Sequence, residues 1–250
     1  MSAAPYASLN LGDHVGDDLS AVAENRRRLR AAAGLPAEPA WLAQVHGTRV
    51  VDLDAVAKLD AEAELDAAGD SDATARGPLG PADAAFTRRR GRVCAILTAD
   101  CLPLLLAAES GDLVAAVHAG WRGLAGGVIE ATVRALQTAP ALRIAPALRV
   151  APEGLMAWLG PAIGPKHFEV GAEVREALLK DDLGAEGAFV PSARGRFMAD
   201  LGMLARRRLS ALGVGRIYGG GQCTYAEGDR YFSHRRDGVT GRQATLIWLE

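Results

Sequence analysis

Apolar runs and amphipathic stretches alternate along the chain, which predicts interleaved strands and helices. Strands are expected where apolar residues follow one another without a helical period, at 48–54, 92–98, 102–108, 112–120, 155–160, 215–220 and 244–249. Helices are expected at 19–34, 127–137, 173–180 and 199–213. The first of these follows Asp17 and Asp18 and precedes Gly34 and Pro36, so it has both a start and a stop signal.

The mixture of continuous apolar runs and hairpin-like pairs favours an α/β fold with a mixed sheet covered by helices over a purely parallel sheet. The turn signal Ser110-Gly111-Asp112 separates one such pair of strands. Two stretches, 60–83 and 139–152, are rich in small residues and proline and are expected to be surface loops. We interpret residues 1–250 as one domain.

Composition excludes several classes of protein. Hydrophobic residues make up 49% and charged residues 23% of the chain, and the formal net charge is -2, as in ordinary globular proteins. No basic region indicates a nucleic-acid partner, and no apolar run approaches the roughly 20 residues of a membrane helix. The N-terminus lacks a signal-peptide pattern. A cytoplasmic protein with no nucleic-acid or membrane partner is therefore expected.

The few cysteines and histidines carry the candidate chemistry. The three cysteines, at 94, 101 and 223, are an odd number with no CxxC spacing, so reduced thiols are expected rather than a disulfide framework. Cys94 lies inside an apolar run and is assigned to the core. The five histidines each lie beside glycine or a turn-forming neighbour. That placement favours sites over core positions.

Three of these residues are expected at strand ends and form a candidate metal site. His46 follows an apolar run that ends at Gly47, Cys101 lies in the turn of "LTADCLPLLL", and His118 ends a strand before a glycine-rich segment. Two imidazoles and a thiolate suit zinc, and three protein ligands leave a fourth position for water or substrate. The spacing of these residues alone leaves an alternative open, in which the two histidines lie in separate turns, Cys101 is a buried thiol, and the three share no metal.

The segment "HAGWRGLAGG" suggests an anion site. Gly120, Arg122 and Gly123 are expected at the start of a helix, where free backbone N–H groups favour an anion and a guanidinium can bind phosphate oxygens. A tight turn with a packed Trp121 and a surface arginine is the alternative.

Seven segments together resemble one family. They are "LNLGDHVGDD", "WLAQVHGTRVV", "ADAAFT", "LTADCLPLLL", "VHAGWRGLAGGVIEATV", "WLGPAIGPKHFEVG" and "QCTYAEGDRYFSHRRDGVTGRQATLIWL", in this order. They resemble the YfiH-type family, long labelled multicopper polyphenol oxidase or laccase-domain proteins. The resemblance covers nearly the whole chain.

The resemblance implies a single α/β domain that binds zinc through His46, Cys101 and His118. It also implies a purine nucleoside phosphorylase acting on adenosine, inosine and methylthioadenosine, with adenosine deaminase activity in some members. The oxidase label is discounted, because a multicopper site needs more imidazoles than five histidines can supply. Zinc is accordingly the expected cofactor and copper the less favoured one.

The resulting hypothesis is phosphorolysis, with phosphate held by the Gly120–Gly123 turn and Arg122. Asp100 is interpreted either as a partner that orients a ligand or accepts a proton, or as a turn cap. Arg49 is a candidate for substrate contact, with a surface role as its alternative. Cys223, in a glycine-rich turn, is a candidate lining residue.

Two other classes of function remain open. One is a cysteine hydrolase, with Cys101 as nucleophile and a histidine as base, which would suit amide cleavage in peptidoglycan precursors. The other is a binding module in which the metal only holds strand ends together. The chain also departs from many relatives at Lys166, His167 and His234, which affects the expected base preference or level of activity.

Overall fold

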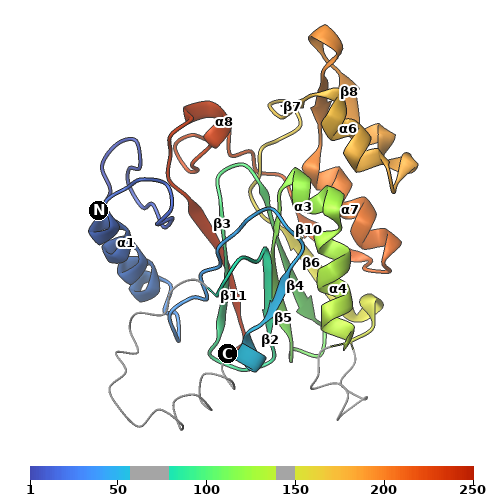
Figure 1. Ribbon diagram of the computed structural model, residues 1–250. Coiled ribbons are helices and arrows are strands. Elements are labelled where there is room, and N and C mark those ends of the chain that lie inside the picture. The colour runs from blue at the N-terminus through green and yellow to red at the C-terminus, as the bar shows by residue number, and fades with distance from the viewer. Residues whose placement is uncertain (57–78, 139–149) are drawn as a thin grey trace.

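The computed structural model describes residues 1–56, 79–138 and 150–250 (Figure 1). Most of both expected surface loops, 60–83 and 139–152, therefore lies outside the described residues. The described part is a mixed α/β structure, as the apolar pattern predicts. No helix in it is long and apolar enough to cross a membrane.

A six-stranded mixed sheet forms the centre of the fold. Its order is β1-β2-β5-β4-β6-β10, with β1 Val50–Asp52, β2 Ala84–Thr87, β5 Val114–Ala119, β4 Leu102–Ala108, β6 Leu155–Leu159 and β10 Arg216–Gly219. The outer pairs β1–β2 and β6–β10 are parallel, and the three inner pairings are antiparallel. The expected hairpin is β4–β5, whose register sets Leu102 opposite Ala119.

Two further strands pack on one face of this sheet. β3 (Val93–Thr98) and β11 (Gln243–Trp248) pair antiparallel, from Gln243 opposite Thr98 to Trp248 opposite Val93. Cys94 and Ile96 of β3 pack with Ala116 of the central sheet in a buried cluster. Cys94 is fully buried, as its place in an apolar run predicts.

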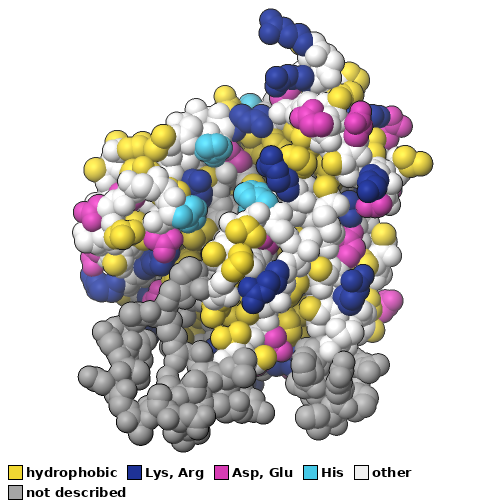
Figure 2. Space-filling model, viewed as in Figure 1, with side chains coloured by type: hydrophobic (Ala, Val, Ile, Leu, Met, Phe, Trp, Pro, Cys, Tyr) yellow, Lys and Arg dark blue, Asp and Glu magenta, His cyan; other side chains and the backbone are white. Residues whose placement is uncertain are grey.

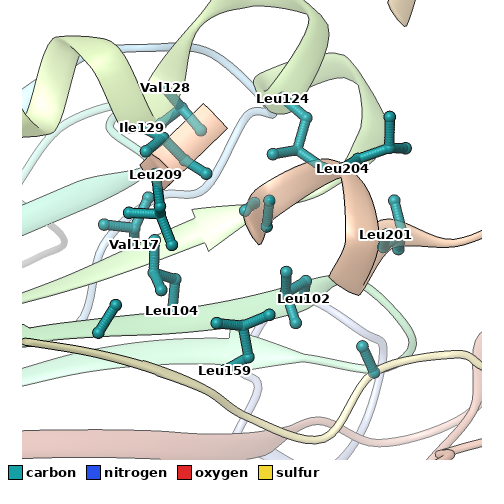
Figure 3. Packing of buried hydrophobic residues seen from close by; sticks show 14 of the residues in the cluster. Leu102, Leu104, Val117, Leu124, Val128, Ile129, Leu159, Leu201, Leu204 and Leu209 are labelled. Atoms are coloured by element: carbon teal, nitrogen blue, oxygen red, sulfur yellow. The ribbon is translucent and has the colours of Figure 1, made fainter. Parts of the chain in front are cut away.

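Helices cover the opposite face of the sheet, above the main core (Figures 1 and 3). They are α3 (Trp121–Gly126), α4 (Val128–Thr138), α6 (Ala172–Leu179) and α7 (Leu201–Ala211). Leu104 and Val117 of the strands meet Leu124, Ile129 and Leu209 of the helices in one cluster. β5 has helices on one face and β3 on the other, and a strand covered on both faces needs apolar residues at successive positions, which explains why its run is continuously buried.

The remaining elements are short or peripheral. α1 (Leu19–Ala32) begins at Asp18, whose side chain accepts the Ser20 N–H, and ends near the expected stop. A small sheet, β7-β9-β8, has strands Glu169–Val170, Phe197–Ala199 and Phe189–Pro191. α8 (His234–Asp237) and the 3₁₀ turns Pro152–Gly154, Leu183–Ala188 and Ala193–Gly195 complete the described elements.

Two local expectations were wrong. The apolar run before His46 forms only isolated bridges, from Ala40 to Cys94 and from Ala43 to Pro81, so His46 lies in a loop and not at a strand end. The helical region expected from 127 begins earlier: Gly120, which was expected at a helix start, is the N-cap of α3, and Gly127 in the left-handed region separates α3 from α4.

Candidate metal centre

Three segments distant in sequence bring His46, Cys101 and His118 together. Their candidate ligand atoms all lie within 4.8 Å of one another. The Cys101 Sγ is 3.5 Å from Nε2 of His46, and the two imidazole rings meet edge to face with centroids 4.6 Å apart. Figure 2 shows histidine and Lys/Arg side chains gathered on the face that holds this end of the sheet.

The sheet itself positions Cys101 and His118. Cys101 lies in the tight turn that joins β3 to β4, and His118 lies in β5, paired with Pro103 of β4. Neighbouring antiparallel strands therefore carry the two side chains to the same end of the sheet. His46 reaches them from its loop with φ of 60°, a conformation rare outside glycine.

A buried carboxylate, Asp83, holds both histidines. Its Oδ1 lies 2.8 Å from Nδ1 of His118 and accepts the backbone N–H of His46, also at 2.8 Å. Its Oδ2 accepts the N–H of Gly47 at 2.6 Å. The bond to Nδ1 leaves Nε2 of His118 for the cluster, which is how carboxylates orient histidine ligands of metals.

Asp83 is the residue that sequence reasoning missed. It was included in the expected surface loop 60–83, whereas it is completely buried and directly precedes β2. A lone carboxylate in the apolar stretch "ADAAFT" is the signal that could have revealed it, because buried carboxylates need specific partners.

Asp100 holds the turn next to Cys101. It has φ of 93°, and its carboxylate accepts the Thr224 hydroxyl and the Arg235 backbone N–H, both at 2.6 Å. Its carbonyl accepts the N–H of Ile163. Asp100 thus ties the Cys101 turn to three later positions of the chain, Ile163, Thr224 and Arg235.

The electrostatics favour a thiolate beside an imidazolium when no metal is present. Burial opposes ionisation of Cys101, but the His118 and His46 imidazoles outweigh it and lower the pKa of Cys101 to about 6. Burial likewise opposes protonation of His118, whereas the Cys101 thiolate and Asp83 raise the pKa of His118 to about 9. Such a thiolate is a ready metal ligand.

Comparison with known proteins decides the family. The family described as multi-copper polyphenol oxidoreductase laccase matches residues 1–250. The chain belongs to this family.

Its relatives match over nearly their whole length. The Escherichia coli K12 protein named purine nucleoside phosphorylase YfiH is 46% identical over 249 residues, which cover 100% of this chain and 89% of that protein. The Pseudomonas aeruginosa protein named purine nucleoside phosphorylase PA4543 is 48% identical over 251 residues, with the same coverage.

Solved structures agree with the fold. The Neisseria meningitidis protein NMB0706 has a TM-score of 0.83 at 43% identity, over 100% of this chain and 90% of that one. YlmD from Geobacillus stearothermophilus also has a TM-score of 0.83, at 32% identity over 100% of this chain and 87% of that one.

The donor set of this laccase-family chain fits a zinc ion. Zinc bonds of about 2.3 Å to sulfur and 2.0–2.1 Å to nitrogen, at tetrahedral angles, separate the two ligand atoms by about 3.5 Å. The Cys101–His46 separation has this value. Gly120 leaves the necessary room, because a Cβ there would lie 2.7 Å from Cδ2 of His46 and 2.9 Å from Sγ of Cys101. The cluster could therefore hold a metal.

The three residues that are candidates for binding phosphate, Gly120, Arg122 and Gly123, lie at the start of α3. Gly120 is the N-cap, and Gly123 is buried against the carbonyls of Gly47 and His118. Arg122 is exposed, with its guanidinium 4.4 Å from the centroid of the Trp121 ring. This stacking corresponds to the packed tryptophan and surface arginine of the alternative interpretation.

The other two candidate residues have structural partners. Arg49 is exposed and its Nη1 donates to the Pro81 carbonyl at 3.0 Å. Cys223 accepts the Gly164 N–H at its sulfur, 3.2 Å away, and precedes the Thr224 that binds Asp100.

Lys166, His167 and His234, which are expected to differ from the resembled family, lie close in sequence to the residues that bind Asp100. His167 stacks on Tyr225 with ring centroids 4.5 Å apart, and Lys166 is exposed. His234 opens α8, next to the Arg235 N–H that binds Asp100.

Proposed function

We propose that the protein is a purine nucleoside phosphorylase that cleaves adenosine, inosine and methylthioadenosine at a zinc centre formed by His46, Cys101 and His118. The observation that carries the proposal is this open three-ligand cluster, in a chain similar over its whole length to proteins named purine nucleoside phosphorylase. Adenosine deamination is the second activity proposed for the same centre.

The chemistry is a displacement at the sugar. A phosphate oxygen forms a bond to the anomeric carbon of the ribose while the glycosidic C–N bond breaks. The purine leaves with the electron pair of that bond and takes up a proton, so adenosine and inosine give the free base and ribose 1-phosphate, and methylthioadenosine gives adenine and 5-methylthioribose 1-phosphate. Bound zinc would supply a Lewis acid that orients a substrate oxygen and stabilises negative charge.

The protein's own groups bind and orient the reactants. In this proposal the N–H groups of the first turn of α3, from Gly120 to Gly123, and Arg122 hold phosphate, since the first N–H groups of a helix lack partners within it. Asp100 keeps the Cys101 turn in place, Arg49 contacts substrate, and Cys223 lines the pocket.

The first experiment follows purified, zinc-loaded protein with adenosine and with inosine, with and without phosphate, by liquid chromatography. Adenine or hypoxanthine that forms only with phosphate, and not with Cys101→Ala, supports phosphorolysis at this centre. Cys94→Ala is the matched control, because Cys94 is buried in the core away from the cluster. Inosine formed from adenosine without phosphate identifies the deaminase activity.

One observation favours a second candidate function. The metal-free Cys101 thiolate beside a protonated His118 is the arrangement of a cysteine nucleophile with its base, which would suit amide hydrolysis. A chelator distinguishes the two, because a thiol hydrolase retains activity without metal. A loss of folding on metal removal, with no activity towards any nucleoside, would favour the binding module instead.

A further inference from the structure

Arg242 lies at the same end of the sheet as the metal centre. β11 pairs with β3 so that Gln243 is opposite Thr98. Continuing this antiparallel register by one residue sets Arg242 across from Ala99, beside the turn that contains Asp100 and Cys101. The strand pairing thus brings Arg242 near the turn that contains Cys101, and the charges of Asp100 and Cys101 act on its guanidinium.

The Arg242 guanidinium makes hydrogen bonds through Nη1, and its Nε and Nη2 have no hydrogen-bond partner among the described residues. Its Nη1 donates to the carbonyls of Thr240 and Gly241, at 3.0 and 2.9 Å. Its stem lies across Gly12, where a Cβ would come within 2.8 Å of the Arg242 Cγ. Nε and Nη2 make no hydrogen bond with the described residues, so one edge of the guanidinium is oriented but not used.

Charge and burial are consistent with an anion site at this edge. Arg242 is partly buried, and burial lowers its pKa while the charges of Cys101 and Asp100 partly offset that effect. Burial removes water from the guanidinium and so destabilises its charged form. An anion that binds to the guanidinium offsets this loss of hydration, because charge-assisted hydrogen bonds are stronger away from bulk water.

Other arginines near the cluster already have partners. Arg236 donates to the Thr224, Tyr225 and Tyr231 carbonyls and to the Asp237 carboxylate. Arg235 donates to the Glu169 carbonyl and lies over the Phe168 ring.

We propose that the free edge of the Arg242 guanidinium is a further contact for the inorganic phosphate, in addition to the α3 N–H groups and Arg122, and helps to present it to the nucleoside. The inference rests on the proposed phosphorolysis and adds a residue next to the last strand to the groups that hold its anionic substrate. Two parallel N–H donors match two phosphate oxygens.

The test measures initial rates of inosine cleavage by the zinc-loaded protein while phosphate and inosine are varied separately. We expect Arg242→Ala to raise the KM for phosphate about 10- to 100-fold, as loss of a charge-assisted contact does. The KM for inosine and the zinc content should stay within about twofold of wild type. Arg242→Lys should restore part of the phosphate affinity, since it keeps the charge but not the two-donor edge.

A second variant keeps the test valid if Arg242→Ala does not fold. Gly12→Ala retains the arginine but displaces its stem, so it should also raise the phosphate KM, by a smaller factor. Arg30→Ala, an exposed arginine in the last turn of α1, is the matched control and should leave both KM values unchanged.

The outcomes separate the two claims. A wild-type protein that forms no ribose 1-phosphate overturns the proposed function, and this inference with it. A wild-type protein that forms ribose 1-phosphate while folded Arg242 and Gly12 variants keep its phosphate KM overturns the inference alone. An equal rise in both KM values for Arg242→Ala also overturns it, since that is the result of a merely structural role.

Discussion

Nδ1 of His118 lies 2.8 Å from Oδ1 of Asp83, and both side chains are buried. The same oxygen accepts the backbone N–H of His46. One carboxylate therefore fixes the ring of one candidate ligand and the main chain of another. Metal affinity should depend on this contact as much as on the ligands themselves.

Replacing Asp83 with Ala or Asn should weaken zinc binding by about 10- to 100-fold, because the His118 ring and the His46 loop both lose their anchor. Competition with a chromophoric chelator measures the affinity. In the cobalt-substituted protein the thiolate-to-metal absorption band should weaken in parallel. Asp181→Asn, at an exposed aspartate, is the control. Unchanged zinc affinity in folded Asp83→Asn protein would contradict this role.

Gly120→Ala should lower metal affinity without removing any ligand. The new Cβ would lie 2.7 Å from the His46 ring and 2.9 Å from the Cys101 sulfur, so these two side chains must separate. Gly215→Ala, where a Cβ meets nothing within 4 Å, should bind zinc as wild type does. Equal zinc content and affinity in the two variants would show that the space beside Gly120 is not part of the centre.

Cysteine alkylation should distinguish the thiols. At pH 7 a Cys101 with a pKa of about 6 is largely thiolate in metal-free protein, whereas burial raises the pKa of Cys94 to about 12. Iodoacetamide should label Cys101 quickly and Cys94 hardly at all. The rate at Cys101 should fall as the pH drops below 6, because the thiol becomes protonated.

Zinc supplies the control for that experiment, since a coordinated sulfur is protected from the reagent. Peptide mass spectrometry before and after zinc addition reads out both sites. Labelling of Cys101 at the same rate with and without zinc would argue against its being a ligand.

Asp100→Ala should destabilise the fold by about 3 kcal/mol, because the buried Thr224 hydroxyl and the Arg235 N–H lose a charged acceptor and φ of 93° strains alanine. Urea unfolding measures the change. Asp100→Asn keeps one acceptor oxygen and should lose less. A stability equal to wild type for Asp100→Ala would show that the carboxylate does not hold the turn.

The buried strands and longer helices could be predicted because their patterns are strong. The β3, β4 and β5 runs are continuous, and α1 and α7 begin at aspartate caps. The β7-β9-β8 sheet could not be predicted, because strands of two or three residues are too short to show the alternation of apolar and polar residues that marks a strand.

The site was predictable only in part for a similar reason. Cys101 and His118 adjoin recognisable strands, so their meeting follows from the sheet. Asp83 ends a stretch rich in alanine and glycine that has the composition of a surface loop, and only its place among the apolar residues of "ADAAFT" distinguishes it from a loop aspartate. Arg242 is placed near the Cys101 turn by the β3–β11 register, which pairs residues more than a hundred positions apart.

In the proposed reaction, phosphate cleaves purine nucleosides at the His46, Cys101 and His118 centre. Mass spectrometry of the sugar released from inosine by zinc-loaded protein in ¹⁸O-labelled phosphate tests this reaction directly. We predict ribose 1-phosphate carrying the label, and none from Cys101→Ala. Unlabelled free ribose as the only sugar product, or labelled ribose 1-phosphate from Cys101→Ala at the wild-type rate, would contradict it.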